Sequence, residues 1–140
     1  MVPMIHDTPK RSLTGAELQA RMEDSFYLVE GLAVYLRVND RKLRQMMQDE
    51  RPIPEGFITE LDQLARTTTQ IISKLTASIE KGQHRHIPVW RTDTEFHAAN
   101  LPFPIPAGAG ARWWRHVAHQ AAQATGAQLK NTKYERSQQR

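Results

Sequence analysis

The chain has 140 residues, a net charge of +4 at pH 7, a sequence pI of about 9.7 and no cysteine. This length suits one domain of ordinary size, or a minimal helical module with a small second unit, and the lack of cysteine excludes disulfides and thiolate metal ligands. The apolar runs are far shorter than the ~20 residues that cross a bilayer, and residues 1–12 lack the apolar core of a signal peptide, so we expect a soluble, cytoplasmic protein with no membrane partner.

Two short helices are predicted first. Thr14 and Glu17 stand at the spacing of a capping box, which starts a helix at Thr14. A second helix is expected over residues 26–36, with Asp24 or Ser25 as its N-cap.

A third short helix and a long one follow. The third is predicted over residues 40–48 with Asn39 as its cap, and it stops before the two prolines of residues 51–54. From Pro54 to Gly82 the apolar residues keep a three-four rhythm, which predicts one long helix or two with a bend. Such a long apolar stripe invites a partner helix.

The character of the chain changes after Gly82. Residues 86–90 are typical of a short strand, which Pro88 confines to an edge or a bulge. A short helix through about Asn100, a loop rich in proline and glycine, and a helix from Ala111 to a stop at Gly126 are expected next, and residues 128–132 are a candidate second strand.

The segment over residues 28–54 has the pattern of a helix-turn-helix. That motif needs a small residue inside the first helix and apolar residues at the turn and in the second helix, and Ala33, Val38 and Leu43 stand at those positions. Leu32, Leu36 and Met46 complete the expected core shared by the two helices.

The same segment resembles the Cro-type, or Xre-type, helix-turn-helix regulators of bacteria and phages. The shared residues are Leu32, Ala33, Leu36, Val38, Arg41, Arg44, Met46, Glu50, Arg51, Pro52, Ile53, Pro54, Gly56, Glu60 and Leu61. The rest of the chain resembles two-domain members of that family that include the anti-CRISPR-associated autorepressors. The resemblance implies a mainly α fold, with a five-helix-type head followed by a small, mostly helical dimerisation unit that holds one or two short β-strands.

Four features depart from the family pattern. Arg37 stands at the turn position that is usually Gly, and Leu28-Val29 replaces the usual Ser/Thr-Gln at the start of the first helix of the motif. Met46 replaces a common tryptophan, and Asp49 replaces the glycine after it.

Family roles carried over to this sequence give a candidate DNA interface without a catalytic or metal site. The residues expected at base edges in the major groove are Asp40, Arg41, Arg44 and Gln45, and those expected at phosphates are Asn39, Lys42, Gln48 and Arg51. One recognition helix touches few base pairs, so the resemblance implies a homodimer on a palindromic operator.

The expected organisation is an N-terminal arm (1–13), a helix-turn-helix domain with a long connecting helix (14–82), a C-terminal dimerisation unit (83–133) and a basic tail (134–140). Residues 111–140 hold six Lys and Arg against one acid, which places the charge excess at that end. The function expected is a sequence-specific transcriptional regulator that acts as a repressor, with no enzymatic activity and no cofactor. The resemblance to autorepressors implies control of its own operon. Two alternatives stay open: an RNA-binding translational regulator, and a protein-protein adaptor or antitoxin whose helix-turn-helix does not bind DNA.

Overall fold

The structure, a computed structural model, describes residues 13–133, so the expected N-terminal arm, apart from Leu13, and the expected basic tail lie outside it. It contains six helices and two strands over those residues: α1 (Gly15–Asp24), α2 (Val29–Leu36), α3 (Asp40–Met47), α4 (Gly56–Gly82), β1 (His86–Val89), α5 (Asp93–Ala98), α6 (Ala111–Thr125) and β2 (Gln128–Asn131). The expected mainly α fold with short strands is confirmed. No helix within the described residues is long and apolar enough to span a bilayer.

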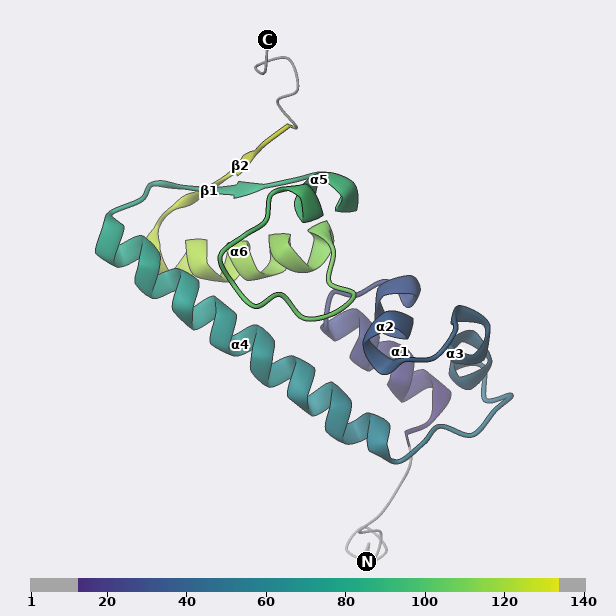
Figure 1. The fold of residues 1–140 in the computed structure, drawn as a ribbon. Helices are drawn as coiled ribbons and strands as arrows, with labels where there is room; N and C mark the ends of the chain where they lie inside the picture. The colour runs from purple at the N-terminus through teal and green to yellow at the C-terminus, as the bar shows by residue number, and fades with distance from the viewer. Residues whose placement is uncertain (1–12, 134–140) are drawn as a thin grey trace, which may run out of the picture.

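The helix α4 is the longest element and runs from the end that holds α1, α2 and α3 to the end that holds the strands (Figure 1). It is one unbroken helix of 27 residues, and four helices precede β1 within residues 13–133, so the five-helix form of the head that the resemblance implied stays a prediction. Helices α1, α2 and α3 gather at one end of α4, and the two strands lie at the other (Figure 1). A single hydrophobic cluster runs through both ends, while the expected division after residue 82 stays a prediction.

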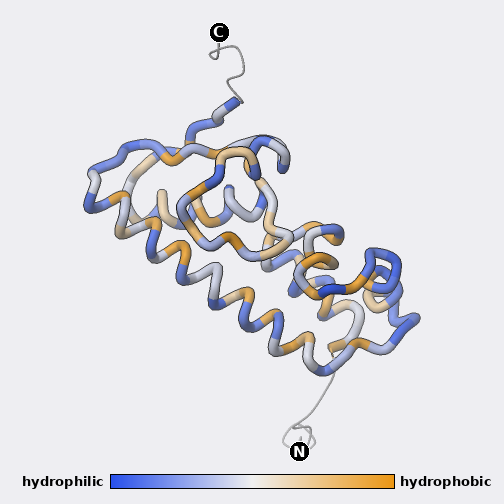
Figure 2. The backbone as a smooth tube through the Cα atoms, in the orientation of Figure 1, coloured by the Kyte–Doolittle hydropathy of each residue, from blue (hydrophilic) through white to orange (hydrophobic). Residues whose placement is uncertain are grey.

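The apolar stripe of α4 is covered from within the same chain. Hydrophobic and hydrophilic positions alternate along α4 (Figure 2), and Ile71, Leu75 and Ile79 are buried where α6 lies beside it. Trp113 of α6 is fully buried, and its Nε1 donates to Thr68 Oγ1 at 3.0 Å. The partner helix that the stripe invites is therefore α6, and the buried part of the stripe is not available for a second molecule.

The strands β1 and β2 form a two-stranded parallel sheet with His86 opposite Gln128 and Val89 opposite Asn131. Pro88 lacks the amide hydrogen that a further strand would need, and its carbonyl accepts from Trp114 Nε1 at 2.7 Å. The β1 residues Ile87 and Val89 are buried, whereas every residue of β2 is exposed. The predicted edge position of Pro88 is thus consistent with the sheet.

The second helix begins later than predicted. Ser25 is the C-cap of α1, Phe26 adopts φ +59°, and α2 starts at Val29 after Leu28, which supplies no side-chain cap. The prediction of a start at Phe26 or Tyr27 is wrong because both aromatic rings are used elsewhere. Phe26 stacks on His116 of α6 with ring centroids 4.0 Å apart, and the Tyr27 hydroxyl donates to the Ala107 carbonyl at 2.8 Å.

Burial shifts the pKa of one residue in each of these two contacts. It raises the pKa of the Tyr27 phenol above its ordinary value, with Tyr35 adding to the effect. It lowers the pKa of His116, and neighbouring His119 lowers it further. Both shifts favour the neutral forms of Tyr27 and His116.

Two glycines let the chain cross itself at this junction. A Cβ built on Gly31 of α2 would lie 2.3 Å from the carbonyl oxygen of Gly108, and one on Gly108 would lie 2.0 Å from that of Gly31. Gly108 also adopts φ +80°. Only glycine at both positions permits this approach, which fixes α2 against the loop before α6.

Candidate nucleic-acid interface

The helices α2 and α3 form the predicted helix-turn-helix core. Leu32, Ala33, Leu36, Leu43 and Met46 are all buried, and Val38 packs against them with partial exposure. The turn is closed by a hydrogen bond from the Val38 amide to the Ala33 carbonyl at 3.0 Å. These contacts fix the crossing of the two helices.

Two of the departures from the family pattern have a local explanation. Arg37 ends α2 in the left-handed conformation, at φ 62° and ψ 41°, so the turn keeps the geometry that glycine usually serves. Asp49 is also left-handed, at φ 62°, and its Oδ1 accepts from the Gly15 amide at 2.8 Å. Asp49, two residues after the end of α3, therefore binds the first backbone amide of α1 and adds to the capping by Thr14.

The N-terminus of α1 lies directly against the end of α3. A Cβ on Gly15 would be 2.2 Å from the Met47 carbonyl oxygen, so α1 approaches α3 as closely as backbone allows. The capping box predicted from Thr14 and Glu17 is present. Helix α1 thus packs against one side of α3, and the side of α3 that carries Arg41 and Arg44 stays exposed.

The open face of α3 carries the predicted base-contacting residues. Arg41 and Arg44 are exposed, Asp40 and Gln45 are partly exposed, and α3 lies at the end of the molecule away from the strands (Figure 1). Five of the six Lys and Arg in residues 13–54 fall between positions 37 and 51, against three acids there. Arg41, Lys42 and Arg44 keep their exposure on this face, which is the condition that a duplex contact requires.

Two of these side chains are held by neighbours. Arg44 Nη2 donates to Glu30 Oε2 of α2 at 3.1 Å, and Arg51 Nε donates to Gln45 Oε1 at 3.1 Å. Arg41 and Lys42 have no side-chain partner among residues 13–133. Among residues 13–133, the face therefore combines two side chains held by neighbours with two cationic side chains that have no side-chain partner.

The residues expected at phosphates have mixed surroundings. Asn39 is the N-cap of α3, and its Oδ1 accepts from the Lys42 amide at 2.8 Å, which leaves the amide hydrogens of its side chain for another partner. Lys42, Gln48 and Arg51 are exposed around the ends of α3. Their predicted contacts with phosphate stay predictions.

A hollow of about 440 Å³ lies beside the interface, between α2 and the start of α6. Its walls include Leu28 and Val34, which are 48% and 60% exposed, together with Phe26 and Arg112. Apolar side chains this exposed suit contact with another molecule, although two residues make only a small patch.

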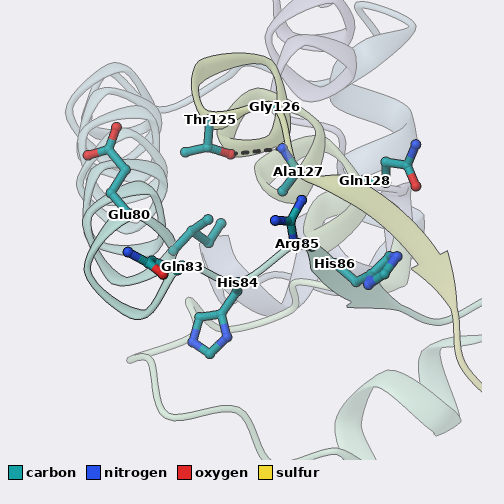
Figure 3. A pocket seen from close by; sticks show the side chains of 10 residues that line it. Glu80, Gln83, His84, Arg85, His86, Thr125, Gly126, Ala127 and Gln128 are labelled. Atoms are coloured by element: carbon teal, nitrogen blue, oxygen red, sulfur yellow. Dashed lines mark hydrogen bonds between the residues drawn. The ribbon is translucent and has the colours of Figure 1, made fainter.

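A second hollow, also of about 440 Å³, lies where α4 and α6 end and the strands begin (Figure 3). His84, Arg85 and His86 stand near the C-terminal ends of both helices, where the partial negative charge favours basic residues. Neither in this hollow nor elsewhere within residues 13–133 do three His, Asp or Glu side chains lie close enough to hold a metal ion.

Sequence reasoning missed Glu30 as part of the candidate site. Its pattern is that of a solvent-facing helix residue, and it is 66% exposed as a side chain even when paired. The available signal was its place in the first turn of α2, which a helix-turn-helix brings close to the second helix.

Comparison with protein-family models found no match to this chain, and comparison with curated proteins found none either.

Proposed function

We propose that the protein is a sequence-specific DNA-binding regulator that inserts α3 into the major groove, most readily as a repressor that excludes polymerase from its promoter. One observation carries the proposal: α3 buries Leu43 and Met46 and turns Arg41, Lys42 and Arg44 to solvent. Arginine to guanine and glutamine to adenine are the pairings that discriminate best between bases, at ~1–3 kcal/mol each. No chemical step is needed for this function.

The regulator acts as a homodimer, because one helix reads too few base pairs for useful specificity. Since α6 covers the apolar stripe of α4, we place the dimer contact in the C-terminal unit, residues 83–133. There β2 is exposed along its whole length, and Leu129 is 36% exposed. Sedimentation of the purified chain at several concentrations tests this, and a monomer that still selects a palindrome contradicts it.

Selection from a random duplex library tests DNA reading. Arg41→Ala and Arg44→Ala should each relax the preference at particular base pairs, by about 5- to 150-fold if the lost contact is worth ~1–3 kcal/mol. Lys74→Ala, an exposed cation on α4, is the matched control and should leave the preference intact. If Arg41→Ala and Arg44→Ala instead weaken binding equally for all sequences, the two arginines are phosphate contacts and not base contacts.

The exposed pair Leu28 and Val34 favours a protein-protein adaptor as the second candidate. An adaptor would bind no duplex even at low salt, where phosphate attraction is strongest. The same selection repeated with RNA separates a translational regulator from a DNA-binding one. Sequence preference for duplex DNA alone selects the first proposal.

A further inference from the structure

The pair between Glu30 and Arg44 joins the two helices of the motif on their open side. Arg44 comes from α3 and Glu30 from the first turn of α2, and the two atoms Nη2 and Oε2 are 3.1 Å apart. Both side chains remain reachable, at 52% and 66% exposed. Arg41 and Lys42, on the same short helix, have no such partner within residues 13–133.

The pair restricts what Arg44 can do. A guanidinium has five N–H donors in a rigid fork, so a bond through Nη2 restrains the orientation of the group and leaves other donors free. A guanine edge accepts two parallel bonds from such a fork, and the match depends on that orientation. An unpaired arginine would instead turn to any nearby phosphate.

Glu30 also brings a negative charge close to the surface that a duplex would approach. This charge repels every phosphate regardless of sequence, because the backbone is uniform. The carboxylate therefore lowers the affinity for all sequences while it orients the side chain that reads one of them.

We infer that Glu30 is a specificity-setting positioning residue, which holds Arg44 toward one base pair and weakens binding to every sequence. The inference rests on the proposed function. Removing the carboxylate has two consequences: tighter binding overall and poorer discrimination. The loss of discrimination is about 1.5- to 5-fold, which is the ~0.2–1 kcal/mol of an exposed ion pair expressed as a ratio.

The experiment measures affinity for two duplexes, the best selected sequence and the same sequence altered at the base pair that depends on Arg44. Glu30→Gln should bind both more tightly and lower their affinity ratio by about 1.5- to 5-fold. Glu30→Asp keeps the charge and should keep the ratio closer to wild type. Glu80→Gln removes one exposed acid at the far end of α4 and should leave the ratio unchanged.

A double-mutant cycle shows whether Glu30 acts through Arg44. In the Arg44→Ala background, Glu30→Gln should no longer change the ratio. An unchanged ratio in Glu30→Gln alone, or the same fall in both backgrounds, overturns the inference and leaves DNA reading by Arg44 intact. A wild-type protein that selects no sequence overturns the proposed function and this inference with it.

Discussion

The crossing of Gly31 and Gly108 gives a sharp test of how the two halves of the chain are joined. A methyl group at position 31 would lie 2.3 Å from the Gly108 carbonyl oxygen, where an ordinary contact begins at 3.4 Å. The obstacle is backbone and not a flexible side chain, and the Tyr27 hydroxyl ties the same loop down at Ala107. Gly31→Ala must therefore push α2 and the loop apart by about 1 Å.

The expected cost follows from two opposing effects. Overpacking of this kind costs about 1–3 kcal/mol, and a backbone clash falls at the upper end of that range. Alanine is a better helix former than glycine by about 1 kcal/mol, so the net loss is about 2 kcal/mol of unfolding free energy. For a chain of this length that corresponds to a melting temperature about 7 °C lower, measured by thermal unfolding followed by circular dichroism.

The chain offers a matched control in Gly56, the first residue of α4. Nothing lies within 4 Å of a Cβ built there, so Gly56→Ala gains helix propensity without a clash and should be neutral or slightly stabilising. If Gly31→Ala proves as stable as Gly56→Ala, the close crossing does not exist and the fixed junction of the two halves is refuted.

Three further outcomes follow from single contacts. Asp49→Ala removes the side-chain acceptor of the Gly15 amide in the first turn of α1 and keeps a strained left-handed residue, so denaturant unfolding should give a loss of about 1–2 kcal/mol, whereas Asp49→Gly should recover part of it. Burial lowers the pKa of His116 below its unfolded value, so the unfolded chain takes up the proton first and stability falls as pH drops through about 6.5; melting temperatures near pH 7.5 and pH 5.5 should differ less in His116→Gln, and an unchanged difference would exclude this histidine as the cause. Thr68→Val leaves the buried Trp113 N–H without its acceptor and should cost about 1–3 kcal/mol by the same unfolding measurement, with a neutral result arguing against the bond.

Elements with local signals could be predicted from the sequence. The capping box at Thr14, the cap at Asn39, the stop at Gly126 and the strand with Pro88 are all found in the structure. Each depends on residues within a few positions of one another, so no knowledge of distant packing is needed. The start of α2 could not be found this way, because Phe26 and Tyr27 are directed by contacts with residues 80 or more positions away.

Long-range partners were the main limit. The stripe on α4 correctly indicated a partner helix, but periodicity does not say whether that helix belongs to the same chain. The bond from Trp113 to Thr68 joins residues 45 positions apart, and only the tertiary structure reveals that α6 fills the role. A stripe of this kind predicts burial, and it does not predict an oligomer.

The candidate site likewise has one part that could be predicted from the sequence and one part that could not. Its buried frame is local in sequence, since Ala33, Val38 and Leu43 set the crossing within a few turns of chain, and this part was predictable. Its outward chemistry is not, because the pairing of Arg44 with Glu30 depends on that crossing angle and involves residues that each look merely solvated. The core of a helix-turn-helix can therefore be predicted from sequence, whereas the partners of its outward side chains are found only once the two helices are placed, as the pair of Arg44 and Glu30 shows.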